Sequence, residues 1–75
     1  MSKEINSPMP GIIVRLEVRK GQDVAEGETL LFLEAMKMEN AIVTPVAGKI
    51  SDILVNVGDK VATRQLLVQI EEMLN

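Results

Sequence analysis

The sequence contains no cysteine and no histidine among its 75 residues. Disulfide bridges, thiolate nucleophiles and metal sites built from Cys and His are therefore excluded. Tryptophan and tyrosine are also absent, and Phe32 is the one aromatic residue. A chain with a formal net charge of -3 and a single aromatic residue has no set of rings on which bases could stack, so it is not expected to bind nucleic acid.

Long hydrophobic runs are missing as well. The longest one, Leu30-Leu31-Phe32-Leu33, is far too short to cross a bilayer, and the first residues lack the apolar segment of a secretion signal. Apolar residues nevertheless make up 47% of the chain, which is enough to fold one small domain. We therefore expect a soluble, cytoplasmic domain that does not insert into a membrane.

The chain contains an internal repeat. Residues 8–34 align with residues 45–71 without a gap, at a constant shift of 37 positions. Two copies are too few for a solenoid, so the repeat indicates a closed unit with two-fold pseudo-symmetry. The nine identical pairs are Pro8/Pro45, Gly11/Gly48, Ile13/Ile50, Val18/Val55, Gly21/Gly58, Val24/Val61, Ala25/Ala62, Leu30/Leu67 and Glu34/Glu71.

Each copy has the pattern of short strands separated by turns. Residues 12–18 and 49–55 are rich in β-branched side chains, and glycine-containing turns follow both segments. We predict four strands per copy, and thus an all-β fold: a flattened eight-stranded barrel or sandwich of two four-stranded antiparallel sheets, each mixing strands of both copies. The predicted core includes Leu31, Leu33, Val68 and Ile70, whereas Phe32 aligns with Gln69 and should be less buried.

The domain is predicted to span residues 7–75. Residues 1–6 have no partner in the alignment of the two copies, so we interpret them as an N-terminal arm or linker remnant.

The junction between the two copies predicts a tight hairpin. Residues 29–43 contain no glycine or proline, but a single strand of that length is rare. The chain must reverse direction between the copies, which places Met36 and Lys37 in a two-residue turn. Such turns usually contain Asn-Gly, because both residues adopt positive φ. Backbone strain of this kind clusters at functional sites, so Lys37 is the candidate functional residue.

The run Ala35-Met36-Lys37-Met38 resembles the biotin attachment site of biotinyl domains, which are the biotin carboxyl carrier domains of biotin-dependent carboxylases, decarboxylases and transcarboxylases. Glu34, the segment 7–11 and Gly48 also match that pattern, and the resemblance covers residues 7–70. It implies a barrel-sandwich hybrid fold with covalent biotin on Lys37 at a hairpin tip. It also implies that Glu34, Ala35, Met36 and Met38 are recognised by the ligase or other partners.

The same resemblance implies a non-catalytic, metal-free carrier. A biotin protein ligase would modify Lys37, because lysine amines are mostly protonated near pH 7 and poorly nucleophilic by themselves. The domain, monomeric in isolation, would then carry CO2 as carboxybiotin between biotin carboxylase and carboxyltransferase active sites.

Two alternatives to this function stay open. One is a lipoyl or dual biotin/lipoyl carrier, although lipoyl domains more often have Asp before the lysine and Ala or Val after it. The other is an unmodified small β-barrel that binds a protein partner.

Overall fold

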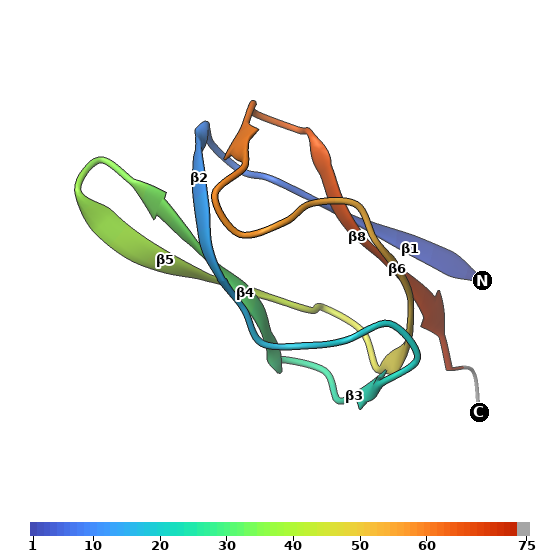
Figure 1. Ribbon diagram of the computed structural model, residues 1–75. Helices are drawn as coiled ribbons and strands as arrows, with labels where there is room; N and C mark the ends of the chain where they lie inside the picture. Colours follow the sequence, from blue (N-terminus) through green and yellow to red (C-terminus); the bar gives the residue numbers. More distant parts are fainter. Residues whose placement is uncertain (74–75) are drawn as a thin grey trace.

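The computed structural model of the protein describes residues 1–73, and all of its regular structure is β-strand (Figure 1). No helix in this part of the chain could span a membrane. Sheet A has the strand order β1-β8-β6-β3 and sheet B the order β5-β4-β2-β7, with antiparallel pairing throughout. The strands are β1 (Ser2–Asn6), β2 (Gly11–Leu16), β3 (Asp23–Val24), β4 (Thr29–Ala35), β5 (Met38–Val43), β6 (Gly48–Ile53), β7 (Lys60–Val61) and β8 (Leu66–Glu72).

The predicted pseudo-symmetry is confirmed. A shift of 37 positions carries β2, β3 and β4 onto β6, β7 and β8, and each sheet combines two strands from each half of the chain. The eight strands and two four-stranded antiparallel sheets are those expected from the repeat.

The prediction of an N-terminal arm or linker at residues 1–6 is wrong. Ser2–Asn6 form β1, which pairs with β8 at the edge of sheet A and occupies the place that β5 holds in sheet B. The alignment missed this strand because its side chains are mostly exposed and share a single identity with β5, Ile5 with Ile42. Ile5 is also the one residue of β1 that reaches the core. The last two residues of the predicted domain, 74 and 75, lie outside the described part of the chain.

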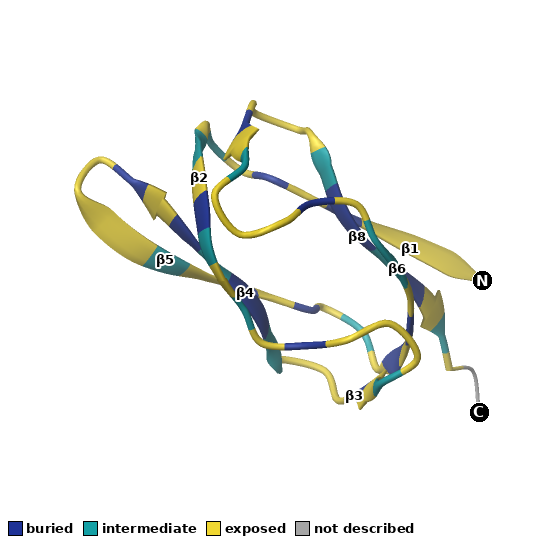
Figure 2. Ribbon diagram, in the orientation of Figure 1, coloured by how far each residue is buried: buried dark blue, intermediate teal, exposed yellow. Residues whose placement is uncertain are grey.

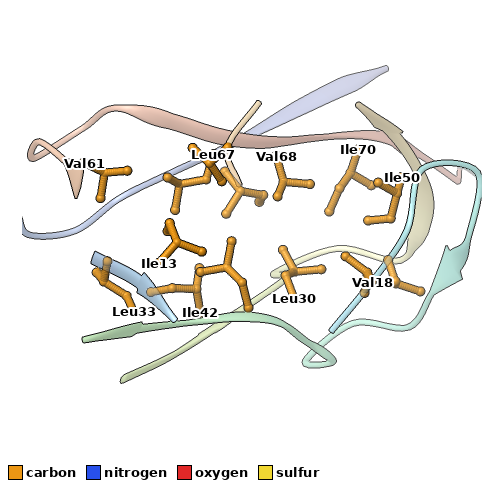
Figure 3. Close-up of a cluster of buried hydrophobic side chains, with 14 residues drawn as sticks. Ile13, Val18, Leu30, Leu33, Ile42, Ile50, Val61, Leu67, Val68 and Ile70 are labelled. Carbon is orange, nitrogen blue, oxygen red and sulfur yellow. The ribbon is translucent and has the colours of Figure 1, made fainter. Parts of the chain in front are cut away.

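The core lies between the two sheets and is aliphatic (Figure 3). The predicted core residues Leu31, Leu33, Val68 and Ile70 are all 0% exposed. Phe32 is half-buried on the outer face of β4, as predicted, where the guanidinium of Arg15 lies 4.4 Å from the ring centroid. Burial alternates from Leu31 to Ala35 in β4 and from Val68 to Glu71 in β8, so one face of each sheet supplies the core and the other faces solvent (Figure 2).

Two equivalent turns, residues 25–28 and 62–65, have different residues at their position of positive φ, Gly27 in the first and Arg64 in the second. In the first turn, the backbone N–H of Glu28 donates to the carbonyl of Ala25, and Gly27 has a φ of +87°. In the second turn, the backbone N–H of Gln65 donates to the carbonyl of Ala62, and Arg64 has a φ of +70°. Positive φ at the third residue is typical of a type II turn, and it favours glycine because a Cβ is strained there. Arg64 therefore adopts a backbone conformation suited to the glycine found in the other half.

Arg64→Gly is expected to raise the free energy of unfolding by about 1 kcal/mol, because it removes the strain of a side chain at positive φ. Chemical denaturation followed by far-UV circular dichroism measures the change. Arg64→Ala is the matched control: it also removes the charge and the long side chain but keeps a Cβ, so it should bring no comparable gain. Equal stabilisation by both variants would contradict the explanation based on backbone strain.

Candidate functional site: the β4–β5 hairpin

The β4–β5 hairpin has the tightest possible connection. Pairing between the strands continues to Ala35 and Met38, which leaves only Met36 and Lys37 in the turn. Their φ angles are +55° and +64°, so both residues adopt the left-handed conformation of a type I′ turn. The predicted two-residue hairpin with positive φ is thus confirmed, without the Asn or Gly that normally occupies such positions.

The turn presents its side chains to solvent. Met36 is 88% exposed and Met38 is 65% exposed, and Lys37 between them is also exposed (Figure 2). The molecule is elongated, measuring 39 × 18 × 17 Å, and the hairpin lies at the end opposite the N-terminus (Figure 1). A primary amine is therefore held at one extremity of the domain, next to two apolar side chains that are not used for packing.

The base of the hairpin is fixed to the body of the domain. Ala35, one of the predicted recognition residues, is only 7% exposed, so its side chain offers little surface to a partner. The amide of Asn40 donates hydrogen bonds to the carbonyls of Leu33 at 3.3 Å and Met38 at 3.2 Å, which links the two strands through a side chain. The strained turn is thus held on a regular, hydrogen-bonded support, which limits the directions in which Lys37 can point.

Two carboxylates face each other directly below the tip. Glu34 on β4 is the register partner of Glu39 on β5, and both side chains are exposed. Like charges at opposite positions of an antiparallel pair destabilise the hairpin. The hairpin therefore carries an acidic pair beside the amine in addition to the strained turn. Within residues 1–73, no group of three or more acidic side chains is arranged to hold a metal ion.

An open hollow of about 520 Å³ lies beside the hairpin. Residues of the hairpin that line it include Lys37, Met36 and Glu34. Ile12 and Lys60, which sequence reasoning did not select, also line it. They are far apart in the sequence, and only the pairing of β2 with both β4 and β7 brings them together.

A comparison with known protein families gives a match over nearly the whole chain. The family described as "Biotin-requiring enzyme" matches residues 3–70. The chain belongs to this family. The predicted biotinyl domain, and biotin as the cofactor of the family, are thereby confirmed.

In each of the relatives described below, the part that matches this chain is a short segment of a much longer carboxylase. Pig mitochondrial propionyl-CoA carboxylase alpha chain is 40% identical over 70 residues, which cover 93% of this chain but 10% of the relative. Pyruvate carboxylase from Aspergillus terreus is 41% identical over 69 residues, covering 92% of this chain and 6% of the relative. The urea carboxylase structure from Kluyveromyces lactis superposes with a TM-score of 0.90 at 27% identity, covering 95% of this chain and 6% of that one.

The chain therefore spans a tenth or less of the length of these relatives. The family match and the carboxylase relatives agree with the prediction of a carrier domain rather than a catalytic one. The superposition also confirms the predicted fold class.

Proposed function

We propose that this chain is a biotin carboxyl carrier domain that is biotinylated on Lys37. The observation that carries the proposal is the geometry of the turn: a type I′ hairpin without glycine holds one exposed amine at the far end of a domain of the biotin-requiring family. Lys37 would hold biotin through an amide bond to its Nζ atom. The residues fit the group, because the tip is exposed and the open hollow beside it leaves room for a long arm.

Lys37 acts as the substrate of a biotin protein ligase. No groups near the tip are arranged as an acyl-transfer catalyst: its neighbours in the turn are the methionines, and the nearest acidic side chains are the Glu34–Glu39 pair. The ligase therefore has to supply both the activated biotin and the deprotonation of the amine. Met36 and Met38 offer exposed, flexible thioether side chains that can adapt to the ligase and later to other partners. Exposed Glu34, next to the turn, adds a charged contact.

The domain itself contributes presentation and reach. When bound, biotin supplies the ureido nitrogen that takes up the carboxyl group, and this chemistry belongs to the cofactor. The rigid hairpin carries the arm clear of the sandwich, so the same group can visit a biotin carboxylase site and then a carboxyltransferase site. CO2 would thus be carried between the two sites on the arm held by Lys37. We propose that the domain does this as a cytoplasmic component of a larger biotin-dependent enzyme, and that it is monomeric in isolation.

The proposal is tested by intact mass after production of the chain with an active biotin protein ligase and excess biotin. The expected result is one added biotinyl group, located on Lys37 by mass analysis of its peptides. A parallel sample made with a lipoate ligase and lipoate measures the lipoyl alternative. An unmodified chain in the presence of active ligase, or biotin on another lysine such as Lys49 or Lys60, would refute the assignment.

A further inference from the structure

One row of side chains crosses the outer face of sheet B next to the hairpin. Strand register places Glu34 on β4 beside Ile12 on β2, and Ile12 beside Lys60 on β7. Leu33 and Ile13 point into the core, so their neighbours Glu34 and Ile12 point outward. All three side chains of the row line the hollow that also contains Lys37.

The equivalent row in sheet A has a different composition. The shift of 37 residues carries Glu34, Ile12 and Lys60 onto Glu71, Lys49 and Asp23, which are also register partners. There the central residue is charged, and Nζ of Lys49 lies 3.7 Å from the Oδ1 atom of Asp23. The row in sheet A is thus a surface ion-pair row, of the kind that needs no ligand.

The sheet B row departs from its counterpart in two ways. Its central residue is Ile12, a large apolar side chain left 37% exposed. Its two charged residues are separated by that apolar position, and neither of them forms an ion pair within residues 1–73. Adjacent strands are about 4.8 Å apart, so the positions of Glu34 and Lys60 are separated by about 10 Å. An apolar centre between a separate acceptor and a separate donor is the pattern of a small-molecule site.

We propose that the row Glu34–Ile12–Lys60 is a resting site for the ring system of the biotin carried by Lys37. The inference rests on the proposed function and adds a second binding surface to it. The ureido group of biotin has two N–H donors and one carbonyl acceptor, whereas a carboxylate only accepts and an ammonium only donates. Glu34 accepts from a ureido N–H, Lys60 donates to the ureido carbonyl, and the apolar thioether ring covers Ile12.

The position of the row relative to the tip suits an intramolecular contact. Lys37 lines the same hollow as Ile12 and Lys60, so its side chain starts at the edge of the site. A tethered group samples such a site at a high effective concentration, which lets weak contacts hold it for part of the time. The contacts are exposed, so the ring is released easily when a partner offers a better site. The row would thus shelter the ring between visits without preventing transfer.

The test compares the unmodified and biotinylated forms of isotope-labelled chain by NMR, with unlabelled biotin on Lys37. Filtered spectra are expected to show NOEs between biotin ring protons and the methyl groups of Ile12. The backbone amide signals of Ile12, Lys60 and Val61 are expected to shift on biotinylation although they are remote from Lys37 in sequence. The variant Ile12→Lys/Lys60→Asp reproduces the sheet A row, and its amide signals at residues 12, 60 and 61 should no longer shift on biotinylation.

Lys49→Ile is the matched control, because it changes the corresponding position of sheet A and should leave the NOEs and shifts as they are. A biotinylated wild-type chain whose shifts are confined to residues 35–39, without NOEs to Ile12, would overturn the resting site but leave the carrier proposal intact. Amide signals of residues 12, 60 and 61 that still shift on biotinylation of Ile12→Lys/Lys60→Asp would also overturn it. A chain that gains no biotin mass would overturn the carrier proposal, and the resting site with it.

Discussion

Lys37→Arg is expected to abolish biotin incorporation and to leave the fold unchanged. Arginine preserves the positive charge and a similar length, but its guanidinium stays protonated and offers no amine to acylate. Residue 37 is exposed, and its positive φ is the same for lysine and arginine, which are both unbranched at Cβ. The free energy of unfolding should therefore change by no more than about 0.5 kcal/mol. Intact mass and avidin binding measure the modification, and circular dichroism measures stability. Biotin retained by the variant would mean that another lysine is the acceptor.

A displaced lysine separates the contribution of the turn from that of the amine. In the double variant Lys37→Met/Met38→Lys, the composition of the hairpin is unchanged, but the lysine moves out of the turn into β5, where residue 38 pairs with Ala35. Small misplacements of a reacting group lower rates steeply, so we expect the ligase to modify this variant roughly 100-fold more slowly. A time course of biotinylation with purified ligase gives the ratio. Equal rates would show that the ligase requires a nearby lysine but not the geometry of the tip.

Gly48→Ala is expected to have the largest effect on stability. A Cβ at residue 48 would overlap the backbone carbonyl oxygen of Glu71 and would lie 2.8 Å from the Cγ2 atom of Ile70. The first of these contacts is with backbone in a paired strand, so β6 and β8 would have to move apart. Overpacking of this kind costs about 3 kcal/mol. A domain of this size has a total stability of about 4 to 11 kcal/mol, so the loss is severe.

Gly21→Ala provides the comparison for Gly48→Ala. Gly21 has φ +90° and nothing within 4 Å of an added Cβ, so only backbone strain of about 1 kcal/mol is expected there. Thermal unfolding should show a decrease in Tm of about 15 °C for Gly48→Ala and roughly a third of that for Gly21→Ala. Circular dichroism is the suitable probe, because the chain has no tryptophan or tyrosine. A smaller loss for Gly48→Ala than for Gly21→Ala would show that the sheets accommodate the extra methyl group.

The repeat made most of the fold predictable. Identities at a constant shift indicate two copies, and alternating apolar positions indicate which residues face the core; Leu31 and Ile70 were identified in this way. The hairpin was predictable for a related reason, because the junction of two antiparallel copies has to reverse direction. Strand β1 escaped prediction because an edge strand buries little, so its sequence carries almost no hydrophobic pattern.

The candidate site was only half predictable. The amino-acid sequence by itself determined the lysine, its flanking methionines and the turn in which they lie, because these residues are neighbours in the chain and the turn depends on local backbone conformation. Only the tertiary structure decided that Ile12 and Lys60 share a hollow with Lys37. Sheet register sets such neighbours through hydrogen bonds between strands distant in sequence, and a shift of one residue would turn each of these side chains to the opposite face.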